Sequence, residues 1–494
     1  MPLKYSLTLL SFLFLSFVNA QSFSAKVIDQ ETQEPIPYAT IETGLHQGMV
    51  SNEEGEFTFL VENVKPRPDS IYIAYMGYET KGIVFKENKG ITIPLVPALY
   101  ELKEVFLTTE VLTIKEIIKK VKDNLDKNYA SNLTKKKIFF RQSDIGIMKK
   151  MELEFKKSTI KELNKKLLDS IRKILPKKSS YYKEVVADLY GDYNNYKLYI
   201  NKAAELYDKN NDISAEGIEK KLEGIFNENI KKDSYLKIKS GIFSTKKQVD
   251  SILQENDEAK AALEKKKQEG TLEFQEQISN QIANLYEQLF FQEGSIIDVL
   301  DNSGRYNFTL DNYTVINEMA VYILQFTPKG GKDFKGTMYV NTQDFAIVRL
   351  DFENVKPLSN FALLGITYRN NIYKGKMLFD KDENGSYSPR FLELLDGSYM
   401  GFDRPVKVIE KNKNVRGRRK QNELFLKLHI QGNQLQKQEL VVFESENITQ
   451  SSFDLVEGKQ IIKATYLSKY DPMFWKDYSI MEPNEAIESF KVVE

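Results

Sequence analysis

The segment from residue 34 to residue 57 constrains the fold of this chain more than any other stretch. Pro35 and Pro37 keep the backbone extended and exclude a helix interior. Residues 51–55, Ser-Asn-Glu-Glu-Gly, have the composition of a tight turn in which the glycine can adopt positive φ. From Phe57 on, apolar residues alternate with polar or small ones, which is the period of a half-buried strand. This region therefore predicts a small β-sandwich of short strands and tight turns.

Residues 1–20 have the organisation of a secretory signal peptide. Lys4 supplies a basic start, residues 7–18 are apolar, and Val-Asn-Ala at residues 18–20 fits a cleavage site. We expect export and a mature chain that begins at Gln21. No later stretch reaches the roughly 18 consecutive apolar residues of a membrane-spanning helix. Because the chain has no cysteine, its domains must be stabilised by packing, and a lipid-anchored N-terminal cysteine is excluded.

The charge balance argues against one class of partner. Lys and Arg together number 70, and Asp and Glu together also number 70, so the formal net charge is zero. No global field draws such a chain to nucleic acid or to anionic lipid, and we expect no nucleic-acid partner. The length of 494 residues allows about three domains of roughly 150 residues each.

The sequence between residues 22 and 108 contains an ordered series of motifs. They are Ala-Lys-Val-Ile-Asp at residues 25–29, Pro-Ile-Pro-Tyr-Ala-Thr-Ile at 35–41, Gly48, the turn and Phe at 51–57, Tyr-Met-Gly-Tyr-Glu at 75–79, Ile-Pro-Leu at 93–95 and Leu-Lys-Glu-Val at 102–105. This series resembles the carboxypeptidase-regulatory-like domain. The resemblance implies a transthyretin-like seven-strand sandwich that is not itself catalytic. We expect strands at residues 23–29, 38–41, 48–51, 56–61, 70–75, 81–85 and 90–95.

In bacteria, domains of this kind stand at the head of many cell-envelope proteins. The resemblance therefore implies an exported protein of a Gram-negative bacterium, located in the periplasm or associated with the outer membrane. Residues 109–131 predict a helix, because Ile114, Ile117, Ile118, Val121 and Leu125 form one apolar stripe. Residues 137–144 and 148–158 predict a β-hairpin. Together with Asn128-Tyr129 and Phe-Phe-Arg-Gln at residues 139–142, this part resembles an uncharacterised family of envelope proteins.

Residues 159–292 are rich in Lys and Glu and poor in Pro and Gly, which predicts a charged helical region. Apolar spacing places helices at residues 160–175, 213–230, 249–268 and 272–291. Residues 235–239 alternate and predict a single strand that joins a sheet from elsewhere. Two interpretations of this region stay open: an insertion that binds a partner, or solvated helices with one buried face.

Residues 293–494 predict an antiparallel β domain. The expected strands are at residues 308–310, 320–326, 336–341, 345–352, 363–373, 391–399, 404–411, 423–431, 438–443 and 461–466. The hairpin at residues 336–349 resembles those in the curved antiparallel sheets of periplasmic lipoprotein carriers. The segment around Trp475 predicts a docked tail. The expected fold class is α+β multidomain, with an N-terminal seven-strand β-sandwich, a helical middle region and a C-terminal curved antiparallel β-sheet. The expected domains are 1–20, 21–108, 109–158, 159–292 and 293–494.

No constellation of residues points to catalysis. A zinc carboxypeptidase needs an H-x-x-E pair and a distant third histidine. This chain has two histidines, and Met49 and Gly432 stand three residues after His46 and His429. Cysteine catalysis is excluded, and neither a G-x-S-x-G elbow nor a phosphate-binding loop is present. We expect no catalytic residue, no cofactor and no enzyme activity.

Two local patterns suggest binding chemistry. Asp380, Asp382 and Asn384 match the first half of a calcium loop, but Phe391 replaces the bidentate glutamate at its last position. The alternative is an Asn-Gly hairpin turn. The run Arg-Gly-Arg-Arg-Lys at residues 416–420 suggests either a grip on lipid phosphates or a solvated loop tip.

The sequence thus predicts a non-enzymatic binding or scaffold protein of the envelope. Its expected partners are other envelope proteins or lipid, with peripheral association with the outer membrane. Two alternatives are a periplasmic carrier that holds an acyl chain in the concave C-terminal sheet, and a β-barrel inserted in the outer membrane.

Overall fold

The computed structural model describes residues 22–44, 47–61, 69–84, 90–98, 112–255, 258, 272–316, 319–382, 384–412, 414–417 and 419–492. The predicted signal peptide lies outside these residues. The chain divides into two compact units. The first comprises the residues up to Ala98 together with Asp471–Asn484, and the second comprises Leu99–Tyr470 together with Glu485–Glu494. Residues 471–484, which we expected in the C-terminal domain, are therefore grouped with the N-terminal unit.

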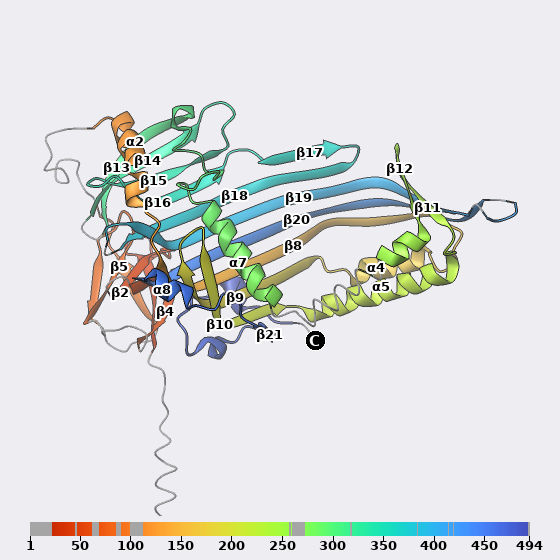
Figure 1. Ribbon diagram of the computed structural model, residues 1–494, viewed down its shortest axis with the longest axis horizontal. Coiled ribbons are helices and arrows are strands. Elements are labelled where there is room, and N and C mark those ends of the chain that lie inside the picture. The colour runs from red at the N-terminus through yellow and green to blue at the C-terminus, as the bar shows by residue number, and fades with distance from the viewer. Residues whose placement is uncertain are drawn as a thin grey trace, which may run out of the picture. The chain divides into compact units, whose positions relative to one another are not determined.

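The first unit contains seven strands in two sheets, as predicted (Figure 1). In one sheet β1 lies in the middle, antiparallel to β4 and parallel to β7. In the other sheet β2 pairs with β3 and β5, and β5 pairs with β6. The strands are β1 (Ser22–Asp29), β2 (Thr40–Gly44), β3 (Gln47–Val50), β4 (Glu56–Leu60), β5 (Ser70–Ala74), β6 (Lys81–Val84) and β7 (Ile91–Leu95).

The predicted turn and register in the first unit are confirmed. Gly55 has a φ of +75°, and the Asn52 side chain accepts hydrogen bonds from the backbone of Glu54 and Glu56 at 3.0 and 2.8 Å. Phe57 and Phe59 are both buried, and their rings lie 6.0 and 5.4 Å from the ring of Phe23. The alternation that begins at Phe57 thus faces the core.

The second unit is built on one large open sheet. Its strands follow the order β13-β14-β15-β16-β18-β19-β20-β8-β9-β10-β21, and every pair is antiparallel except the parallel pair β10–β21. Two additions extend it, since β17 pairs with β18 and the β11–β12 hairpin pairs with β19. This confirms the predicted large antiparallel sheet.

The strands of the second unit have the following bounds. In chain order they are β8 (Thr134–Ser158), β9 (Lys178–Gly191), β10 (Tyr196–Tyr207), β11 (Tyr235–Ser240), β12 (Phe243–Gln248), β13 (Tyr306–Ile316), β14 (Met319–Pro328), β15 (Phe334–Asn341), β16 (Ile347–Asn354), β17 (Ser359–Leu363), β18 (Ile366–Lys381), β19 (Tyr387–Lys411), β20 (Lys420–Asn447) and β21 (Thr465–Leu467).

Several strands are much longer than expected. The predicted hairpin at residues 137–144 and 148–158 is wrong, because β8 runs unbroken through Gly146 for 25 residues. It pairs with β20 along its whole length and with β9 over residues 134–147, so the segment around Gly146 is paired on both sides and forms no turn. The predicted strand pairs in residues 391–411 and 423–443 likewise merge into β19 and β20. Register shifts at Asn370, Ile409 and Gln431 mark bulges that let such long strands twist together.

The charged middle region holds both helices and strands. The strands β9 and β10, which the helical interpretation did not include, belong to the sheet and lie near the edge that ends in β21, whereas the predicted strand at residues 235–239 is confirmed as β11. The helices are α2 (Ile114–Asp123), α3 (Leu125–Asn128), α4 (Lys165–Ile174), α5 (Lys209–Asn229), α7 (Leu272–Glu287), α8 (Gln450–Asp454) and α9 (Glu485–Glu488), with 3-10 turns η2 (Ser303–Arg305) and η3 (Pro472–Trp475).

One helix lies across the sheet of the second unit. Figure 1 shows α7 crossing the strands, and two hydrogen bonds attach it to β10. Gln275 donates to the carbonyl of Leu198 at 2.5 Å, and the Tyr196 hydroxyl donates to the carbonyl of Ser279 at 2.6 Å. In the described part of the chain, no helix combines the length and the hydrophobicity needed to cross a membrane.

Candidate functional site

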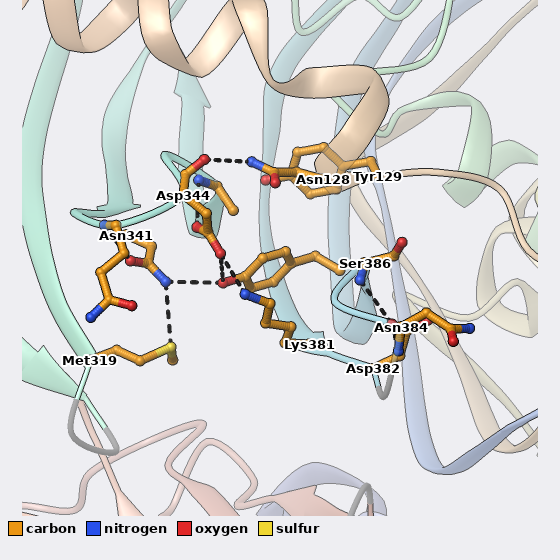
Figure 2. Close-up of polar contacts among 12 residues, drawn as sticks. Asn128, Tyr129, Met319, Asn341, Asp344, Lys381, Asp382, Asn384 and Ser386 are labelled. Carbon is orange, nitrogen blue, oxygen red and sulfur yellow. Dashed lines mark hydrogen bonds and ion pairs between the residues drawn. The ribbon is translucent and has the colours of Figure 1, made fainter.

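The incomplete calcium loop forms the turn between β18 and β19 (Figure 2). One carboxylate oxygen of Asp382 accepts hydrogen bonds from the backbone of Asn384 and Ser386 at 2.9 and 2.8 Å. Asp380 forms an ion pair with Arg390 on β19. Gly385 takes a φ of +83°, as a hairpin turn requires. These carboxylates thus stabilise the turn, and the described residues contain no group of three or more acidic or histidine side chains placed to hold a metal.

Asp344 organises the polar contacts beside this turn. Its carboxylate accepts from the Lys381 ammonium at 2.7 Å and from the Tyr387 hydroxyl at 3.0 Å. The Tyr387 hydroxyl also accepts from the side-chain amide of Asn341 at 3.0 Å (Figure 2). Asp344 lies in the β15–β16 turn, so this network joins two neighbouring hairpins at one end of the sheet.

Asn128 and Tyr129, singled out in the sequence, attach the end of α3 to the β15–β16 turn. Asn128 donates to the backbone carbonyl of Asp344 at 2.9 Å. The buried Tyr129 hydroxyl donates to the carbonyl of Ile347 at 2.8 Å and accepts from its N–H at 2.7 Å. Ile347 stands opposite Val340 on β15, and the pairing of β16 with β18 begins only at Arg349, so the Tyr129 side chain satisfies the backbone of Ile347 where β18 does not pair with it. Asn128 and Tyr129 therefore hold the end of α3 against the β15–β16 turn.

The structure describes one of the two histidines. His46 lies outside the described residues. His429 is on β20, where its Nδ1 lies 2.9 Å from the Asp403 carboxylate and its Nε2 lies 3.7 Å from Glu154. Of the basic run at residues 416–420, Arg416 and Arg419 are exposed in the β19–β20 turn, Arg418 lies outside the described residues, and Lys420 begins β20 and pairs with Glu423.

A row of charged side chains runs across the middle of the sheet. Glu184, Arg141, Glu439, Glu393 and Lys376 stand directly opposite one another on β9, β8, β20, β19 and β18, and we call them the charge row. Arg141 belongs to the Phe-Phe-Arg-Gln motif of the sequence. It is buried, and its guanidinium lies 2.7 Å from Glu184 and 3.9 Å from Glu439. The pairing partly offsets the desolvation of these charges.

The charge row contains two carboxylates, Glu439 and Glu393, in directly opposite positions. Like charges in such positions repel. Lys437 reaches both, at 2.7 and 3.1 Å, and Lys376 lies 3.0 Å from Glu393. Every carboxylate of the row therefore has a cation beside it, which is what burial demands of an ionised group.

The opposite face of the same strands carries a groove of about 480 Å³. Its walls come from β8, β9, β10, β20 and the start of α5, and polar side chains and tyrosines predominate. The lining residues are Asp144, Gly146, Ser179, Ser180, Tyr181, Glu205, Tyr207, Asp208, Asn211 and Gln434. We call this the polar groove.

Hydrogen bonds fix the acidic groups of the polar groove. Asp144 accepts from the side-chain amides of Gln142 and Gln436, the latter at 2.9 Å, and Glu205 accepts from the Tyr181 hydroxyl. Burial, followed by the bond to Glu205, raises the pKa of Tyr181. Lys183 stands opposite Glu205, and burial lowers its pKa although Glu205 and Asp144 oppose this. The groove therefore presents fixed hydrogen-bond acceptors beside tyrosine rings.

The sequence alone did not locate the polar groove. Its residues come from β9 and β10, in a region predicted to be helical, and from strands far apart in the chain. Polar and apolar residues alternate in residues 178–207, which indicates strands. The high Lys and Glu content of the region obscured this alternation.

The sequence of the first unit matches a known family model. Residues 23–107 match the CarboxypepD_reg-like domain. The N-terminal unit carries a CarboxypepD_reg-like domain. The seven strands described above are the structure of this CarboxypepD_reg-like domain, and the resemblance expected from the motifs at residues 25–57 is confirmed.

Two further comparisons concern the whole chain. No curated protein matches the sequence. Among solved structures, the MucA/MucB complex of Pseudomonas aeruginosa is similar over 64% of this chain and 93% of the matched chain, with 7% identity and a TM-score of 0.15. At that TM-score the match supports no conclusion about the second unit.

Proposed function

We propose that this protein is an exported, non-enzymatic binding protein of the bacterial cell envelope, in which the CarboxypepD_reg-like domain serves as a scaffold and the second unit holds the partner. The observation that carries the proposal is the polar groove, which is large enough for a ligand or a short peptide segment. The presence of a CarboxypepD_reg-like domain fits a binding or scaffold role in general.

The chemistry of the polar groove supports recognition rather than reaction. Both oxygens of Asp144 already accept hydrogen bonds from amides, and Glu205 accepts from Tyr181. A carboxylate held in this way is a fixed acceptor for donor groups of a partner. Histidine is the residue type best suited to acid–base catalysis. His429, however, contacts Asp403 and does not line the polar groove.

Site-specific photo-crosslinking in the native host tests the proposal. A photoreactive amino acid at Tyr207, in the groove, should form a defined adduct with an envelope component. The same amino acid at Tyr199, which is exposed on the same strand but outside the groove, is the matched control. Equal labelling at the two positions, or none at Tyr207, would show that the groove is not the binding site.

Export is tested separately by intact mass. The protein isolated from the envelope should begin at Gln21, because residues 1–20 have the pattern of a cleaved signal. A mass that includes residues 1–20, or recovery only from the cytoplasm, would contradict the envelope location without affecting the groove.

One observation favours a second candidate, the carrier of an acyl chain. Ile366, Phe402, Ile430 and Met151 stand directly opposite one another across four strands and remain half-buried, so they form an apolar band on one face. Such a band suits a hydrocarbon chain. A fluorescent fatty acid should bind and should be lost in Ile430→Lys, whereas the neighbouring Lys427→Met should retain it. No binding by the unmodified chain would remove this candidate.

A further inference from the structure

Large apolar side chains are exposed at the tips of two hairpins in the second unit. At the β11–β12 turn, Ile242 is 82% exposed and Phe243 is 48% exposed. At the β17–β18 turn, Leu363 and Leu364 are 51% and 50% exposed. Single exposed apolar residues are ordinary, but a group of them indicates an interaction surface. We call these four residues the tip patch.

Arg404 on β19 holds the two tips together. Its Nε donates to the Ser240 hydroxyl at 2.6 Å, and its other nitrogens donate to the carbonyls of Ser240 and Leu364. The guanidinium also lies 4.9 Å from the ring centre of Phe243. A single buried side chain thus binds both turns, which Figure 1 shows toward the same end of the long strands. The tip patch is therefore one surface and not two separate ones.

Further apolar residues continue the tip patch along one strand row. Phe361, Tyr368 and Met400 stand directly opposite one another on β17, β18 and β19, and all three are exposed. Every residue of the edge strand β17 is exposed. An exposed apolar edge strand of this kind is a surface that another apolar group can cover.

Lysines cluster on the strands that carry the tip patch. Lys237 stands opposite Lys246, and Lys239 stands opposite Lys407, although like charges in such positions repel. Lys407 has Glu423 at 2.6 Å, whereas no carboxylate of the described residues pairs with Lys237, Lys239, Lys246 or Lys411. We call these last four the lysine cluster. Mutual repulsion, chiefly from Lys239, lowers the pKa of Lys237.

We propose that the tip patch and the lysine cluster dock the protein on an anionic lipid surface. Ile242, Phe243, Leu363 and Leu364 enter the boundary between headgroups and acyl chains, and the lysines contact the lipid phosphates. The form of the surface favours lipid over an acidic protein, because the apolar residues occupy projecting tips and the cations flank them. Arg416 and Arg419 are exposed further along, in the β19–β20 turn beyond Lys411. The inference does not depend on the polar groove.

Vesicle sedimentation tests this proposal with the purified full chain. Vesicles of phosphatidylcholine containing about a third phosphatidylglycerol should bind the protein, and pure phosphatidylcholine should bind it far more weakly. Half-molar salt should weaken the binding to anionic vesicles, because it screens charges to within a few ångströms. The double variant Ile242→Asp/Phe243→Asp should lose binding. Lys237→Glu/Lys239→Glu/Lys246→Glu should bind roughly a hundred-fold more weakly, from about a factor of five or more per lysine.

Matched controls separate the surface from general effects of charge or hydrophobicity. Lys115→Glu/Lys119→Glu/Lys122→Glu on α2 makes the same change in net charge, and Ile174→Asp on α4 removes an exposed apolar residue elsewhere. Both should bind vesicles as the unmodified chain does. Circular dichroism and thermal unfolding check that each variant is folded.

Two outcomes would overturn the proposal. One is vesicle binding that the tip-patch and lysine-cluster variants retain. The other is failure to bind either kind of vesicle, with salt-sensitive binding to poly-L-glutamate that the lysine variant loses. In that second case the surface recognises an acidic polypeptide and not lipid.

Discussion

The charge row and the lysine cluster are both made of charged side chains in opposite positions on neighbouring strands, but they follow opposite rules. In the charge row each buried carboxylate has a cation beside it, and Lys437 bridges the two glutamates that face each other. In the lysine cluster, Lys237 and Lys246 face each other without a carboxylate partner among the described residues. Buried charges must be paired, and the charge row meets this requirement. The lysine cluster is tolerated without partners because water surrounds it and screens its charges.

The difference separates structural charge from charge that is available to a partner. An ion pair that is already satisfied inside the sheet offers little to a ligand. Unpaired cations on an exposed hairpin gain most when an anion approaches, because they relieve their mutual repulsion at the same time. Three predictions test this difference between buried and exposed charges.

The largest effect is expected for Arg141. Arg141→Leu leaves Glu184 buried without its cation and leaves Glu439 with Lys437 alone, so the free energy of unfolding should fall by about 3–5 kcal/mol. Lys137→Leu is the control, since its ion pair with Glu444 on the same pair of strands is partly exposed and should matter by less than about 1 kcal/mol. Denaturant titration measures both. Similar losses for the two variants would mean that Arg141 is not a buried structural charge.

A smaller effect of the opposite sign is expected for Lys136. This lysine is buried near Tyr193, its ammonium donates to the Thr134 hydroxyl, and burial lowers its pKa to about 8 from 10.5. Between these values the unfolded chain holds more protons than the folded chain, so stability should rise as pH increases from 8 toward 10.5. At pH 7 the charged form is retained in both states, and its burial costs up to roughly 3 kcal/mol.

Lys136→Met tests this pH dependence. At pH 7 the variant should unfold with a higher free energy than the unmodified chain, and the advantage should shrink as pH rises above 8. Lys135→Met, at the half-buried neighbour that pairs with Glu446, should show no such gain in stability. A difference between Lys136→Met and the unmodified chain that stays constant from pH 7 to pH 10 would show that this lysine does not titrate in that range.

The smallest effect on stability is expected in the lysine cluster. Lys237→Glu turns a repulsive cross-strand pair with Lys246 into an attractive one, so the free energy of unfolding should rise by about 0.2–1 kcal/mol. Lys237→Gln should give a lesser gain. Denaturant titration measures both variants. A decrease in stability would mean that Lys237 is stabilised by an anionic group in the folded protein.

Local features were predictable from the sequence, and long-range ones were not. The burial of Phe57 follows from a turn and an alternation within ten or so residues. The motif containing Arg141 was recognisable, but nothing near it in the sequence indicates Glu184 and Glu439 as its partners. The lysines of β11 were visible as an alternating series. That Lys239 faces Lys407 depends on the register between strands distant in sequence, which no local pattern sets.

The strand β8 has a consequence for the order of events during folding. One of its two neighbours, β20, pairs with it from Thr134–Asn447 to Ser158–Leu424, and nearly the whole second unit separates them in the chain. Closing so large a loop is entropically costly and slow, so the middle of the sheet cannot form until the last strands have been synthesised. Until then β8 has a bare edge that other chains could pair with. A chain truncated before Lys420 should therefore lack the strand that joins β19 to β8 in the middle of the sheet, and not only its C-terminal segment.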